Sequence, residues 1–278
     1  MARRSFGRAF GSDAVLREQL IGSVAAPIRP DGRAADFPST ALAVLDLIDL
    51  DAPASRLQPS LDWLIAQANR PGAFGEGCTA ARHARRVCEH FVSGFFSPAL
   101  PSQRAAPAAM PNGKVYRVES QARFAVSCLA LTGVLRGGRA HEPAVQRHLD
   151  SFTNLQLEWE TWGEFLVPDL AFSAIAALAA APERWRPTLE GLVRLVGNRQ
   201  LPDGTWPRVD FFNALDGICR VNHPLIRPIL EQALPGLLQR QRDDGSFGNV
   251  AADERALAGL RVLERVVSPA PGPAKTSQ

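Results

Sequence analysis

The sequence predicts an all-α protein built from helical hairpins that repeat about every 43 residues. Two observations lead to this prediction: a short turn motif recurs along the chain, and segments with the period of an amphipathic helix flank each copy. The chain has 278 residues, of which 46% are hydrophobic and 21% are charged, so it can bury a large core. We therefore expect one domain over residues 13–267, with a disordered leader (1–12) and a disordered tail (268–278).

The repeated turn contains a glutamine, a glycine and an aromatic residue at fixed spacing. It is clearest at Gln200-Leu-Pro-Asp-Gly204-Thr-Trp206 and at Gln241-Arg-Asp-Asp-Gly245-Ser-Phe247. Related copies end at Phe74 and Trp162, and the four aromatic residues stand 88, 44 and 41 residues apart. Since 88 is twice 44, a degenerate copy is expected near residue 116, where Pro-Asn-Gly-Lys-Val-Tyr spans 111–116; another Pro-Asp-Gly lies at 30–32. Six turns at a period of roughly 40–47 residues indicate a repeat architecture.

Each turn separates two helical segments with apolar residues at i, i+3, i+4 and i+7. The segments before the turns are longer and amphipathic, and they cover 13–25, 57–67, 143–156, 187–200 and 224–241. The segments after the turns are smaller and more apolar, and they cover 39–50, 120–135, 169–180, 209–221 and 254–266, with Ser39 expected as an N-cap. One such hairpin cannot bury its apolar face alone, so the copies must stack.

The second repeat departs from this pattern. Its helix after the turn, 78–96, is the most charged of the set. The following segment, 97–111, contains four prolines, and proline inside a helix costs about 3 kcal/mol. We expect this segment to be mostly loop, either an opening or flap of the ring or a plain surface loop.

The Gln–x3–Gly–x–Trp turn followed by a helix rich in small residues resembles the QW repeat of squalene–hopene cyclases, class II terpene cyclases and protein prenyltransferase β-subunits. This resemblance covers about residues 13–266. It implies an α/α toroid (barrel) of six hairpins, in which six inner helices line a lumen and six outer helices surround them. It also implies that the Gln and aromatic residues of the motif are structural, tying each turn to neighbouring helices.

Composition excludes several classes of protein. A net charge of +3 is too small to indicate nucleic-acid binding. The four cysteines are scattered without a CxxC pair, and residues 1–10 lack an apolar signal segment, so a cytoplasmic location is expected. No run is long and apolar enough to span a bilayer. A peripheral membrane contact and a protein partner remain open.

Inner helices that all follow turns point the same way, so their N-termini should form one rim suited to anions. His83, Arg86 and His90 share one face of 78–96, and Arg123 lies on the next inner segment. Clustered cations of this kind suit a diphosphate, which would bring Mg²⁺ with it. The alternative is internal ion pairing with nearby carboxylates such as Asp46 or Glu89.

Acidic residues head several inner helices, at Asp36, Asp169, Asp210 and Glu254. Helix capping explains such positions, and general acid catalysis is the sharper alternative. The resemblance implies a DxDD motif followed by Thr-Ala as the proton donor. Here Asp36 precedes Thr40-Ala41 without the central acids. Asp169 or Asp210 would then have to serve as the acid.

The fifth inner helix carries further polar residues. Asp216, Cys219 and His223 share a face at i, i+3 and i+7, and they are residue types that bind zinc. In the prenyltransferases the Asp and Cys are two residues apart and the His comes from a later repeat, so the spacing does not favour zinc. Asp216 is instead a third candidate acid, Asn213 a substrate-binding residue, and aromatic side chains are expected to line the lumen and stabilise cations (Tyr116, Phe172, Phe211 and Phe212).

The leading functional prediction is a terpene cyclase-like enzyme, an isomerase or lyase of isoprenoid biosynthesis. It would fold a prenyl diphosphate or polyprene in the lumen and cyclise it by acid-initiated or diphosphate-assisted carbocation chemistry. A zinc-dependent prenyltransferase-like enzyme is one alternative. A noncatalytic interaction toroid is the other, and it predicts that the charges in the lumen pair with one another.

Overall fold

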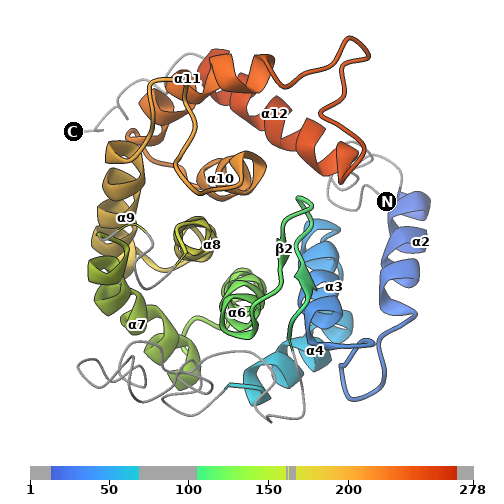
Figure 1. The fold of residues 1–278 in the computed structure, drawn as a ribbon. Helices are drawn as coiled ribbons and strands as arrows, with labels where there is room; N and C mark the ends of the chain where they lie inside the picture. The colour runs from blue at the N-terminus through green and yellow to red at the C-terminus, as the bar shows by residue number, and fades with distance from the viewer. Residues whose placement is uncertain (1–13, 69–104, 161, 163–166, 268–278) are drawn as a thin grey trace, which may run out of the picture.

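The computed structural model describes residues 14–68, 105–160, 162 and 167–267, and in Figure 1 its helices form a ring. The inner helices, those that follow the turns, are α3 (Phe37–Asp49), α6 (Glu119–Arg136), α8 (Asp169–Leu178), α10 (Phe211–Ile218) and α12 (Ala252–Val267). In Figure 1 the first four lie towards the middle of the ring, and α12 lies at its edge beside α11. The outer layer contains α2 (Ala14–Ala25), α4 (Ala54–Ala66), α7 (Pro143–Glu160), α9 (Arg186–Asn198) and α11 (Ile226–Leu238). The predicted all-α fold class is confirmed, and the predicted helical segments correspond to these helices to within a few residues at each end.

The inner helices pack on one another in chain order, α3 on α6, α6 on α8, α8 on α10 and α10 on α12. Outer helices pack against them from outside: α4 packs on α3, and α9 packs on α8. A short 3-10 helix, η2 (Glu183–Trp185), leads into α9. Eight of the ten residues of helix α8 are buried, which explains why its sequence is almost entirely apolar. The predicted inner helix at 78–96 lies outside the described residues, and so do the predicted leader and tail.

The recurring turns have a common backbone conformation. Gly32, Gly113, Gly204 and Gly245 all lie in the left-handed region, with φ between 80° and 88°, where glycine is favoured. At Gly204 a Cβ atom would also lie 2.2 Å from the carbonyl oxygen of Gln232, so no other residue fits there without movement of α11. Gly204 is therefore required both by the turn and by the close approach of the next outer helix.

The glutamine and tryptophan of the clearest motif tie the turn to its neighbours. The side-chain amide of Gln200 donates to the carbonyl oxygens of Gly204 and Ile229, at 3.0 Å each. The indole N–H of Trp206 donates to the carbonyl of Val196 at 2.8 Å. This turn thus joins α9, which precedes it, to α11 of the next repeat, as the resemblance implied for structural residues.

One local prediction was wrong. Asp36, and not Ser39, caps α3: its carboxylate accepts a hydrogen bond from the Ser39 backbone N–H at 2.8 Å. Pro38 then falls in the first turn, where its missing N–H costs nothing.

A β-hairpin lies inside the ring, and the sequence did not predict its strands (Figure 1). Strands β1 (Ala108–Ala109) and β2 (Val115–Tyr116) pair antiparallel, with Ala108 opposite Tyr116. The backbone N–H of Met110 donates to the carbonyl of Lys114 at 2.7 Å, and Gly113 closes the turn. We call residues 105–118 the inner hairpin. The predicted turn at 111–116 is thus present, but it crosses the inside of the ring.

Candidate functional site

The inner hairpin meets the N-terminal ends of α8 and α10 in a buried polar cluster. The Asp169 carboxylate, whose side chain is 7% exposed, accepts from the Lys114 ammonium at 2.5 Å. Its other oxygen accepts from the Asp210 backbone N–H at 2.8 Å. At the start of α10, where the sequence predicted part of a rim for an external anion, a carboxylate of the chain itself accepts this N–H.

Asn213 links three parts of this cluster. Its amide nitrogen donates to the Asp169 carbonyl at 3.1 Å, and its amide oxygen accepts from Asn112 of the hairpin at 3.1 Å. The Tyr116 hydroxyl lies 3.4 Å from the same amide nitrogen. Burial raises the pKa of Tyr116, and the negative charge of Asp169 raises it further, so the phenol stays protonated. These groups hold the hairpin against the inner helices.

The three acids that the sequence proposed as catalytic have partners within the protein. Asp210 is the N-cap of α10, and its carboxylate accepts from the Asn213 backbone N–H at 3.0 Å. Asp216, at the other end of α10, pairs with Arg220 at 2.8 Å and lies 3.6 Å from Arg261. Asp169 pairs with Lys114, so each of the three acids either caps a helix or forms an ion pair within the protein.

The predicted diphosphate-binding residues fall into two groups. His83, Arg86 and His90 lie outside the described residues. Arg123 is buried and its Nε donates to Glu119 at 2.8 Å. The Glu119 carboxylate also accepts from the backbone N–H groups of Ala105 and Ala106, at 2.9 and 3.0 Å. Burial opposes ionisation of Glu119, but these hydrogen bonds and Arg123 together lower its pKa. Arg123 thus supports the carboxylate that anchors the base of the inner hairpin.

The predicted lumen aromatics are buried among other rings and arginines. Phe172 packs edge-on against Trp206, with ring centroids 5.3 Å apart. The guanidinium of Arg240 lies 4.4 Å from the Phe211 ring centroid, and that of Arg255 lies 4.8 Å from the Phe212 ring. Cation–π contacts of the kind expected for a substrate carbocation are thus made by arginines of the chain.

Asp216, Cys219 and His223 do not converge on a common point. The His223 Nε2 lies 2.9 Å from the Glu190 carboxylate, whereas Asp216 faces Arg220. Burial raises the pKa of the Cys219 thiol to about 12, which disfavours the thiolate that binds metals. Among the residues that the structure describes, no three His, Cys, Asp or Glu side chains are grouped to hold a metal ion.

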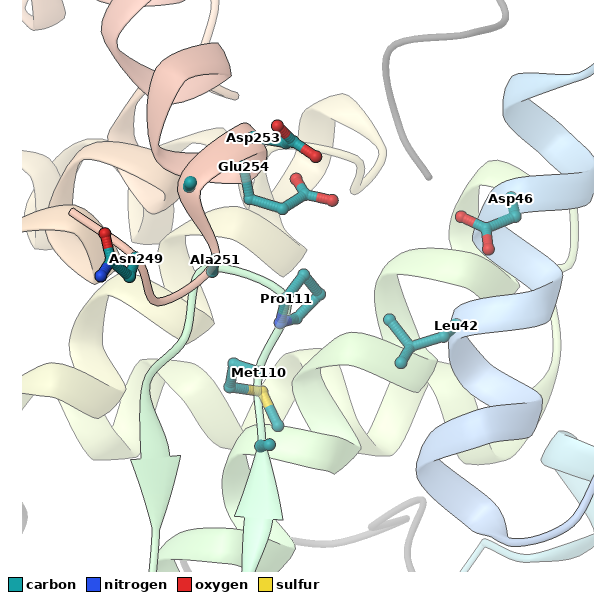
Figure 2. A pocket seen from close by; sticks show the side chains of 10 residues that line it. Leu42, Asp46, Met110, Pro111, Asn249, Ala251, Asp253 and Glu254 are labelled. Atoms are coloured by element: carbon teal, nitrogen blue, oxygen red, sulfur yellow. The ribbon is translucent and has the colours of Figure 1, made fainter. Parts of the chain in front are cut away.

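A cavity of about 400 Å³ opens between α3, the inner hairpin and the start of α12, and we call it the α3–α12 cavity. In Figure 2, Asp46 and Leu42 of α3 lie on one side, Met110 and Pro111 of the hairpin lie below, and Asp253 and Glu254 of α12 lie above. Its walls thus combine apolar side chains with three carboxyl groups. The Asp46 residue is 4% exposed, so this carboxyl sits in the protein interior at the cavity wall.

A smaller cavity of about 50 Å³ lies in the lumen, and we call it the lumen cavity. It runs among α3, α6, α8 and α10 from the hairpin tip to the Asp216–Arg220 pair. Phe172 and Asn213 are the two predicted substrate-binding residues that line it. The inner hairpin and the inner-helix side chains fill much of the remaining space.

Sequence reasoning missed the α3–α12 cavity. From the sequence alone, Asp46 was expected only as a partner for internal ion pairs. No sequence pattern singled out Asp253 or Met110, because only the inner hairpin brings Met110 opposite α12. The repeated turn could have located the N-termini of α3 and α12, but not the gap between these helices.

Known structures share this arrangement of helices. A protein from Actinoplanes has 13% sequence identity and a TM-score of 0.59, with 96% of this chain and 89% of that chain covered. MstE, a type II terpene cyclase from Scytonema, has 16% identity and a TM-score of 0.54, with 95% and 86% covered. The fold resembles that of a type II terpene cyclase. No protein-family model matches the sequence, and no curated protein matches it either.

At these identities the terpene cyclase-like fold is what the comparison establishes, because one fold can carry many functions. The helices of the described residues are all too short or too polar to cross a membrane.

Proposed function

We propose that this protein is a terpene cyclase-like enzyme that cyclises a neutral isoprenoid chain held in the α3–α12 cavity. The observation that carries this proposal is the cavity itself, a space of about 400 Å³ whose walls combine apolar side chains with carboxyl groups. Small-molecule sites typically measure about 300–1,000 Å³ and combine apolar walls with a few polar groups. The similarity to MstE, solved with its substrate geranylgeranyl dihydroxybenzoate, supports an isoprenoid as the ligand.

Asp46 is the proton donor in this proposal. It is buried on an inner helix and borders the cavity beside Leu42, so an alkene in the cavity can approach its carboxyl group. The Asp46 proton adds to one alkene carbon and leaves a tertiary carbocation at the other. A second alkene of the chain attacks this cation and closes a ring, and loss of a proton from a neighbouring carbon ends the reaction. The product is an isomer of the substrate.

Asp253 and Glu254 fit the second half of this reaction. They border the cavity from the first turn of α12 (Figure 2), where negative charge also interacts favourably with the helix dipole. Their charges would stabilise the carbocation and one of them would accept the final proton.

The charge of the cavity supports the acid-initiated mechanism over the diphosphate-assisted one. Asp46, Asp253 and Glu254 border the cavity, and its described lining contains no arginine, lysine or histidine. A diphosphate there would be repelled. We therefore assign the acid-initiated route, with Asp169, Asp210 and Asp216 as positioning residues for the hairpin and α10.

The test is incubation with geranylgeraniol, squalene and geranylgeranyl dihydroxybenzoate, and in parallel with prenyl diphosphates and Mg²⁺, followed by mass spectrometry. We expect a cyclic isomer of a neutral substrate that gains one deuterium in D₂O. Asp46→Asn should lower turnover by about 10²–10⁴-fold, the usual contribution of a general acid. Asp49→Asn is the control, because Asp49 lies on the same helix but does not line the cavity. Full activity of Asp46→Asn would exclude this acid, and conversion of diphosphates alone would exclude the neutral-substrate route.

A noncatalytic toroid is the second candidate, and a specific observation favours it. The polar groups of the inner layer described above pair with one another, as Lys114 does with Asp169 and Arg220 with Asp216. Binding of the neutral isoprenoids without conversion, in folded protein, would support this candidate over the enzyme.

A further inference from the structure

We propose that Met110, at the tip of the inner hairpin, sets the length of the isoprenoid chain that the α3–α12 cavity accepts. This inference rests on the proposed function for the nature of the ligand. It starts from one observation: Met110 and Pro111 line both the α3–α12 cavity and the lumen cavity. The hairpin tip is therefore the wall between them.

Helix α3 places the two cavities side by side. Leu42 and Asp46 line the α3–α12 cavity, and Leu45, on the same stretch of helix, lines the lumen cavity. A chain that lies against Leu42 in the α3–α12 cavity reaches Met110, and beyond Met110 lie the apolar side chains of the lumen cavity, such as Leu129 and Ala176. The lumen cavity is a continuation that the hairpin tip closes off.

The backbone of this wall is fixed at several points. Lys114 binds Asp169, and Asn112 donates to Asn213 at 3.1 Å. The Met110 N–H donates to the Lys114 carbonyl at 2.7 Å. The backbone of the tip is thus held in place, whereas the Met110 side chain is unbranched and adaptable. Truncation of this side chain should open the wall without moving the hairpin.

The space released matches one isoprenoid unit. Met110→Ala removes Cγ, Sδ and Cε, and the lumen cavity of about 50 Å³ holds roughly one or two further heavy atoms. Together they accommodate about five heavy atoms, the size of one isoprenyl unit. Each methylene newly buried tightens binding about fourfold. A ligand one unit longer should therefore gain at least about tenfold in affinity relative to the shorter one.

The experiment measures binding and needs no turnover. Geraniol, farnesol and geranylgeraniol compete with the neutral fluorescent probe N-phenyl-1-naphthylamine for the wild-type protein and variants. We expect Met110→Ala to shift the affinity ratio of the longer to the shorter alcohol by at least about tenfold. The milder Met110→Val should shift this ratio by about threefold. Unchanged ratios in both variants, or no displacement of the probe by any alcohol, would overturn the inference.

Two further variants isolate the wall from general loosening of the protein. Leu189→Ala shortens a buried side chain of α9 that lines neither cavity, so it should leave the length preference unchanged; an equal shift in this variant would contradict the role of Met110. Ala176→Leu refills the lumen cavity, so the double variant Met110→Ala/Ala176→Leu should regain the wild-type ratio. These ratios measure binding and not turnover. A shift of the ratio in a protein that cyclises nothing would refute the proposed enzyme and support the role of Met110. Cyclisation without a shift would support the enzyme and refute the role of Met110.

Discussion

Replacement of Lys114 by Met tests how the inner hairpin is held. The change leaves the buried Asp169 carboxylate without its cationic partner. Removal of one member of a fully buried ion pair costs about 3–5 kcal/mol. Here the Lys114 side chain is 23% exposed, and Asp169 keeps its hydrogen bond from the Asp210 N–H at 2.8 Å. We therefore expect a loss of about 2–3 kcal/mol in the free energy of unfolding.

Urea denaturation followed by circular dichroism measures this loss. With a slope of about 3 kcal/mol per molar urea, the midpoint should fall by about 0.7–1 M. The same substitution at the other lysine of the chain, Lys275→Met, is the control. Lys114→Met/Asp169→Asn completes a double-mutant cycle, with an expected coupling of about 1–2 kcal/mol. A Lys114→Met midpoint equal to that of the control, or a coupling near zero, would refute the reasoning that this ion pair secures the hairpin.

Two further predictions concern stability. Gln200→Ala should lower the free energy of unfolding by about 1–3 kcal/mol, because two backbone carbonyls lose a hydrogen-bond donor. The same change at the exposed Gln241 should cost less than half as much. Midpoints of urea denaturation measure both losses, and equal losses would contradict the prediction. Burial lowers the pKa of His148 to about 3 from an ordinary value of 6.5, so the unfolded chain binds its proton first. Stability should thus fall by about 1.4 kcal/mol per pH unit from pH 6.5 down toward 3, and His148→Phe should remove this slope while the exposed His141→Phe keeps it.

The all-α fold could be predicted because the geometry of the turn restricts which residue types it can contain. Gly204 must adopt a positive φ and admit the backbone of Gln232, and Gln200 must reach two carbonyls, so the residue types recur at fixed spacing. The helical period of the flanking segments supplied the rest. Each of these contacts joins a turn to the next outer helix, so it recurs in the repeats and leaves a periodic signal in the sequence.

The candidate site was less predictable because it depends on contacts between distant residues. The acids at helix N-termini stood out in sequence, but whether such a group caps a helix or reacts depends on its neighbours. Asp169 meets Lys114 across 55 residues, and Asn213 meets Asn112 across 101. The hairpin that brings them together has strands of two residues each, too short for a periodic signal. Asp46 became a candidate only when the α3–α12 cavity placed it beside apolar walls.

The inner hairpin also bears on how the molecule unfolds. In an open array of helical repeats each unit contacts its neighbours alone, so the ends can melt while the middle persists. Here the hairpin bonds Asn112 to α10 and Lys114 to α8, and so it joins repeats that are not consecutive. Loss of the Asn112 contact or of the Lys114 contact should therefore weaken the packing of both α8 and α10. We therefore expect the described repeats to unfold in a single cooperative transition instead of melting one after another.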